Sequence, residues 1–86
     1  MDMRTAHETL TAKDTAKLQS YAARIKWGFS LKSLKRQIEK FRKGTEHDRA
    51  EVLFLLEDCN FHDAAAYLCD GDVEGAVKWA EANLSF

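Results

Sequence analysis

The sequence predicts an all-α protein, a compact bundle of four to five short helices with no sheet. Proline is absent from the 86 residues, and the four glycines lie mostly where helical patterns would stop. Apolar residues recur at intervals of three and four, as they do on helices that bury one side. We therefore expect a single helical domain over residues 1–86, with residues 1–10 as a candidate disordered segment.

The first helix is predicted from about residue 12 to residue 26. Thr11 can serve as its N-cap, and Asp14 completes a capping box in which each side chain satisfies a backbone amide of the first turn. Its apolar residues are expected to form one buried stripe, made of Leu18, Tyr21, Ala22 and Ile25. A glycine turn flanked by Trp27 and Phe29 is expected to end the helix.

A second helix is predicted between Ser30, which can cap it, and Gly44. Its apolar residues share one side and are Leu31, Leu34, Ile38 and Phe41. Six bases occupy the opposite arc, with Glu39 as the single acid among them. They are Lys32, Lys35, Arg36, Lys40, Arg42 and Lys43.

Three further helices complete the predicted bundle. Thr45 and Asp48 repeat the capping pattern before a helix whose centre, residues 52–56, is apolar on every side and so belongs in the middle of the core. A strand there is disfavoured, because a single short strand would have nothing to pair with. Asn60 with Asp63 is expected to cap a short fourth helix, and Asp72 is expected to cap the last one.

Charge is divided unevenly along the chain, although the net charge is −1. Residues 1–50 carry twelve Lys or Arg against six acids, a balance of +6. Residues 51–86 carry one base, Lys78, against eight acids, a balance of −7. Such a distribution favours contacts with charged macromolecules, and the surplus of acids could form a surface for a basic partner.

The basic helix is the leading candidate for a contact surface. We expect Lys32, Lys35, Arg36, Lys40 and Lys43 to make the contacts, with Trp27 and Phe29 as apolar anchors. The face would suit an acidic protein patch, phosphates or an anionic membrane surface, and a purely solvated face is the alternative. Direct nucleic-acid binding is less favoured, because no aromatic residue interleaves the bases as a stacking platform. The two aromatic residues could instead close the end of the bundle.

No arrangement of residues in the sequence predicts a metal site, a cofactor or catalysis. Cys59, His62 and Cys69 do not provide four converging ligands for zinc, and the cysteines are expected to be reduced. Asp70-Gly71-Asp72 lacks the remaining ligands of a calcium loop. No nucleophile is paired with a base and an orienting group, so we expect no enzyme activity.

The chain shows no segment for membrane insertion or export. Its longest apolar run, from Ala64 to Cys69, is far shorter than a membrane span. Residues 1–4 show no pattern of a secretory signal, so we expect a complete small protein located in the cytoplasm.

Residues 50–83 resemble a ubiquitin-associated domain. An apolar helix is followed by Asn60-Phe61 near the place of that family's Gly-Phe turn, by an alanine-rich helix, and by Asp72-Val73-Glu74-Gly75-Ala76-Val77-Lys78-Trp79, which is similar to its last-helix motif. The Met-Gly that precedes the phenylalanine in the family is replaced by Cys59-Asn60. The resemblance implies a three-helix fold and a ubiquitin-binding module.

Residues 33–40, Ser-Leu-Lys-Arg-Gln-Ile-Glu-Lys, are similar to the central helix of the Hha family of bacterial nucleoid modulators, and Asp58 falls near an acidic position of that family. This resemblance implies a helical, non-enzymatic modulator of transcription that docks on a larger DNA-binding protein.

Together these observations predict a small non-enzymatic interaction module. We expect it to bind a larger protein or nucleoprotein complex through its basic helix and to inhibit or modulate that complex, as accessory regulators of phages and plasmids do. The Hha-like and ubiquitin-associated functions are the alternatives. A homodimer that joins basic to acidic halves is a further expectation.

Overall fold

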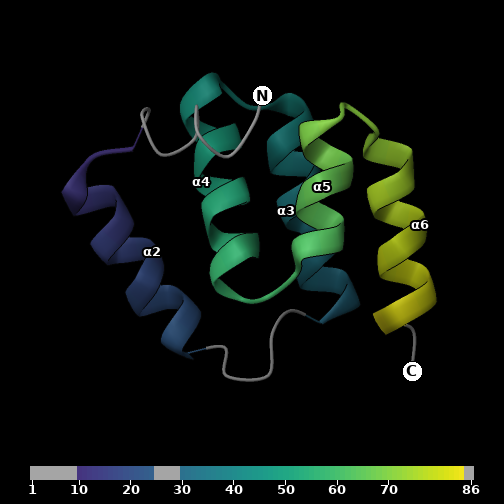
Figure 1. Ribbon diagram of the computed structural model, residues 1–86, viewed down its shortest axis with the longest axis horizontal. Coiled ribbons are helices and arrows are strands. Elements are labelled where there is room, and N and C mark those ends of the chain that lie inside the picture. The colour runs from purple at the N-terminus through teal and green to yellow at the C-terminus, as the bar shows by residue number, and fades with distance from the viewer. Residues whose placement is uncertain (1–9, 25–29, 85–86) are drawn as a thin grey trace.

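The structure is a computed structural model that describes residues 10–24 and 30–84. Within these residues the chain forms five α-helices and no strand (Figure 1), which confirms the all-α prediction. The helices are α2 (Ala12–Arg24), α3 (Leu31–Lys43), α4 (Glu46–Asp58), α5 (His62–Cys69) and α6 (Val73–Leu84). Trp27 and Phe29, the expected apolar anchors, lie outside the described residues.

Four of the helices form a closed ring. Helix α3 packs against α4, α4 against α5, α5 against α6, and α6 returns to α3. Helices α3 and α5 therefore occupy opposite corners of the ring, and α5 lies in front of α3 in Figure 1. Helix α2 lies outside the ring and packs on α4. None of the described helices combines the length and the apolar character that a membrane crossing requires.

Helix α4 is the centre of the core because it packs against three neighbours, α2, α3 and α5. All residues from Val52 to Leu56 are buried, and Leu53 and Leu56 have no exposed surface. The sequence prediction for this segment is confirmed. A helix that is apolar on every side needs neighbours around its whole circumference, and α2, α3 and α5 are those neighbours.

Local hydrogen bonds begin the helices where the sequence predicts. Thr11 and Asp14 exchange side-chain and backbone hydrogen bonds before α2, and Thr45 and Asp48 do the same before α4. The hydroxyl of Ser30 accepts a hydrogen bond from the Ser33 amide at the start of α3. Before α6, Asp72 accepts one from the Gly75 amide. Each cap satisfies amides that have no partner within their helix.

The turn after α4 corrects the prediction for Asn60. Asn60 does not cap α5. The N-cap residue of α5 is Phe61, and no side-chain hydrogen bond caps this helix. Asn60 instead has a φ of 63°, and its amide donates to the Glu57 carbonyl while the Phe61 amide donates to the Leu56 carbonyl. This pattern is a Schellman motif with asparagine in its left-handed position, so Asn60 ends α4.

Candidate interaction surface

The basic surface, defined as Lys32, Lys35, Arg36, Lys40 and Lys43, lies on the outer side of α3. The opposite side of this helix is held in the core by Leu34, Ile38 and Phe41, which are at most 7% exposed. Because these anchors span almost the whole helix, the outer side is fixed in orientation. All five bases are exposed, as the sequence predicts.

Carboxylates of neighbouring helices approach both edges of the basic surface. Toward α6, Nζ of Lys35 lies 3.4 Å from Oε1 of Glu81. Toward α4, Nζ of Lys40 lies 3.6 Å from Oε1 of Glu51. Both lysine side chains remain more than 40% exposed, so these are surface ion pairs that a competing carboxylate could replace at small cost.

Glu39 neutralises charge at the carboxyl end of α3. Its carboxylate accepts two hydrogen bonds from Arg42 and lies 3.3 Å from Nζ of Lys43. The hydrogen bonds from Arg42, aided by Lys43, hold the pKa of Glu39 below its ordinary value. Glu39 is therefore a fixed negative charge within the basic arc.

Lys32 and Arg36 form the open centre of the basic surface. They are exposed and stand four residues apart on α3, so they project from the same side of the helix. No carboxylate of the described residues forms an ion pair with either of them. These two bases therefore carry positive charge that the described part of the molecule does not neutralise.

A groove of about 260 Å³ adjoins the basic surface between α2, α3 and α4. Leu18 and Leu55 line it along with Tyr21, and its charged lining residues are Lys17, Arg24, Lys40 and Glu51. Tyr21 is 37% exposed, which corrects its assignment to a buried stripe. Among the described helices, α4 is the only main neighbour of α2. One side of the apolar stripe of α2 therefore stays open.

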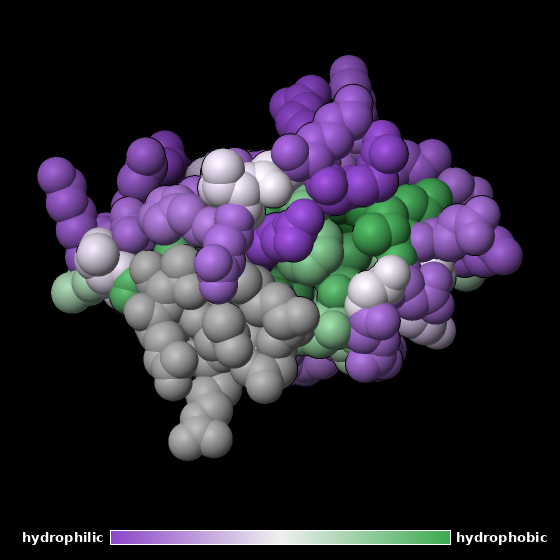
Figure 2. All heavy atoms as spheres, turned by 90° about the horizontal axis from the view of Figure 1, so that it is seen from above, coloured by the Kyte–Doolittle hydropathy of each residue, from purple (hydrophilic) through white to green (hydrophobic). Residues whose placement is uncertain are grey.

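Arg49 joins α3 to α4 at one end of the ring. Its Nε donates to the carbonyl oxygen of Phe41 at 3.3 Å, and its guanidinium lies 5.8 Å from the centre of the Phe41 ring. Both residues line a hollow whose other members include Leu68 and Val73. Figure 2 views this end of the bundle and shows apolar surface within a hydrophilic rim. Arg49 therefore contacts a neighbouring helix, α3, whereas Lys32 and Arg36 form no ion pair with any described residue.

His47 is the centre of an ion-pair network between α2 and α4. Its Nε2 lies 3.1 Å from Oδ2 of Asp14 on α2, and its Nδ1 lies 3.3 Å from Oε1 of Glu51. The hydrogen bond from His47, together with those from Thr11, lowers the pKa of Asp14 to about 2, and the bond to Asp14 raises the pKa of His47. The network therefore fastens α2 to α4.

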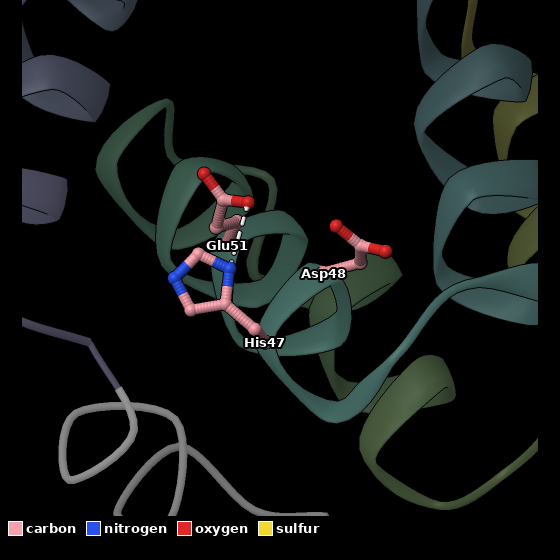
Figure 3. A group of neighbouring side chains, drawn as sticks. All are labelled: His47, Asp48 and Glu51. Carbon is pink, nitrogen blue, oxygen red and sulfur yellow. Dashed lines mark ion pairs between the residues drawn. The ribbon is translucent and has the colours of Figure 1, made fainter.

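The group of His47, Asp48 and Glu51 has the residue types of a metal site (Figure 3). In the figure His47 and Glu51 point toward each other and are joined by the ion pair. Asp48 belongs to the capping box of α4. Its carboxylate accepts a hydrogen bond from the Thr45 amide, and its own amide donates one to the Thr45 hydroxyl. Because each of these groups already has a protein partner, the arrangement is that of a cap and an ion-pair network.

The residues considered for zinc and calcium have other roles. Cys59 and Cys69 are half-buried, and burial raises the pKa of the Cys59 thiol. His62 pairs with Glu57. Gly71, with a φ of 78°, forms the Schellman turn that ends α5.

Comparisons with protein-family models, with curated proteins and with solved structures find no match for this chain.

Proposed function

We propose that this protein is a non-enzymatic interaction module that binds an acidic surface of a larger macromolecular complex and thereby inhibits or modulates it. One observation carries the proposal. Lys32 and Arg36 are exposed and have no ion-pair partner among the described residues, on a helix whose inner side is locked in the core. Two bases held about 6 Å apart on a rigid helix are preorganised for a pair of carboxylates.

The edges of the basic surface would contribute during docking. Lys35 and Lys40 are held by exposed ion pairs, which stabilise a protein little, so a partner's acids could take the place of Glu81 and Glu51. Lys40 also borders the groove that contains Tyr21. Tyr21 could thus supply the apolar contact that the sequence assigned to Trp27 and Phe29.

An acidic protein surface is the preferred partner because the bases of α3 are not interleaved with aromatic side chains on which nucleotide bases could stack. No aromatic side chain of α3 stands among its bases, since Phe41 is buried on the other side. The Hha-like and ubiquitin-associated functions stay predictions from sequence resemblance. The same holds for a phage or plasmid origin and for a location in the cytoplasm.

Reversing the two central charges tests the proposal. The variant Lys32→Glu/Arg36→Glu should lose its partner in affinity capture from the native cell lysate, while its helical circular dichroism stays that of the wild type. The matched control, Lys13→Glu/Lys78→Glu, changes the net charge equally at exposed residues on α2 and α6 and should retain the partner. Lys35→Glu is a poorer test, because it also breaks the ion pair with Glu81.

The capture is repeated after nuclease treatment. A partner protein retained under these conditions supports protein binding, whereas loss of all capture with nuclease would reassign the surface to nucleic acid. If the double reversal retains the same partner as the control, the basic surface is not the contact.

A further inference from the structure

A second surface lies between α5 and α6, on the far side of the ring from the outer side of α3. It contains a hollow of about 330 Å³ lined by Asp63, Ala66, Tyr67, Asp70 and Trp79. Because α3 and α5 occupy opposite corners of the ring (Figure 1), this hollow and the basic surface can be occupied at the same time. We call these five residues the acid–aromatic surface.

The charges of this surface come from one side of α5. Asp63, Tyr67 and Asp70 follow each other at intervals of four and three residues, so they share a helix face. The other face is buried through Ala64, Ala65 and Leu68. Asp63 and Asp70 are exposed, and neither forms an ion pair with any base of the described residues.

The aromatic residues are positioned by the fold. Tyr67 is 38% exposed, one of two large hydrophobic residues in the described chain that are exposed to this degree, the other being Tyr21. Trp79 is held by an edge-on contact with Phe61, with ring centres 5.8 Å apart. A Cβ at Gly75 would lie 2.7 Å from Cδ1 of Tyr67, so glycine gives the tyrosine ring room to lie against the first turn of α6.

Aromatic rings beside carboxylates provide the chemistry that recognises a cation. The ring faces attract an ammonium or guanidinium group, and the carboxylates accept its hydrogen bonds. Asp63 and Asp70 are separated by seven residues, about 10 Å along the helix axis. Two basic side chains three residues apart in an extended chain span a similar distance.

From this geometry we infer that the acid–aromatic surface binds a Lys- or Arg-bearing segment of a protein partner. The two exposed tyrosines then belong to two docking surfaces of opposite charge, with Tyr21 beside bases and Tyr67 beside acids. A molecule with both surfaces occupied would connect an acidic partner to a basic one. This inference does not depend on the function proposed for the basic surface.

The test is a nuclear magnetic resonance titration of the ¹⁵N-labelled full chain. The probe is an acetylated, amidated peptide with two arginines separated by two alanines. The side-chain indole resonance of Trp79 and the amides of residues 63–70 should shift together. Tyr67→Ala should weaken binding about two- to fivefold, as expected for loss of an exposed cation–aromatic contact. Asp63→Asn/Asp70→Asn should weaken it further and reduce its dependence on salt.

Tyr21→Ala is the matched control, because Tyr21 is equally exposed but borders the basic surface. It should bind the peptide like the wild type. Equal effects of Tyr21→Ala and Tyr67→Ala, or shifts located away from residues 63–70 and Trp79, would overturn the inference. If raising the protein concentration alone shifts these resonances and the peptide reverses the shifts, the occupant is a second copy of this chain and the inferred separate partner is wrong.

Discussion

Replacing Arg49 with alanine should destabilise the fold without affecting the basic surface directly. The variant loses the hydrogen bond from Nε to the Phe41 carbonyl and the contact between guanidinium and ring. A net hydrogen bond contributes about 1 kcal/mol, and an exposed cation–aromatic contact contributes about 0.5–1 kcal/mol. The free energy of unfolding should therefore fall by about 1.5–2 kcal/mol. For a chain of this length the whole free energy of unfolding is about 4–13 kcal/mol.

Urea unfolding followed by circular dichroism measures this loss, and thermal unfolding should show a midpoint lower by about 6–16 °C. Arg36→Ala is the matched control, because Arg36 has no ion pair among the described residues, and its unfolding free energy should stay within about 0.5 kcal/mol of the wild type. The reasoning is refuted if Arg49→Ala is as stable as Arg36→Ala. Such a result would mean that the contacts between Arg49 and Phe41 do not hold α3 against α4.

Three other predictions concern the core, the ion-pair network and one turn. Leu53→Ala should cost about 2–5 kcal/mol in urea unfolding, because the side chain has no exposed surface; a cost below about 1 kcal/mol would show that α4 is not central. His47→Gln should reduce stability most between about pH 4 and 6.5, where His47 and Asp14 are both charged. Their contribution fades as His47 loses its proton above its raised pKa, and as Asp14 gains one when the pH falls toward about 2; a difference independent of pH would contradict the pairing. Asn60→Ala should cost about 1–2 kcal/mol, because alanine is strained at a φ of 63°, while Asn60→Gly should cost nothing; equal stabilities would reject the strain.

The parts of the fold that depend on nearby residues could be predicted from the sequence. Thr11 with Asp14 and Thr45 with Asp48 are three residues apart, so their capping boxes are visible as short patterns. The central position of residues 52–56 was predictable because an apolar circumference requires neighbours on all sides. The outward direction of the α3 bases follows from the opposite apolar stripe.

Features that depend on tertiary packing could not be predicted in this way. His47 meets Asp14 across 33 residues of sequence, and no periodic pattern connects them. The ion pair between Lys35 and Glu81 forms only because α6 lies beside α3. Tyr21 is exposed because α4 is the only main neighbour of α2 among the described helices. Asn60 was placed at the wrong helix because asparagine serves both as an N-cap and as a left-handed terminator.

The most direct test of the central claim compares two charge-reversed variants against the partner identified by capture. Isothermal titration calorimetry should show that Lys32→Glu/Arg36→Glu weakens binding at least about tenfold, because each new carboxylate would face an acidic surface. Lys13→Glu/Lys78→Glu, with the same net charge, should bind nearly as tightly as the wild type. Equal affinities of the two variants would contradict the claim that the open centre of α3 is the contact surface.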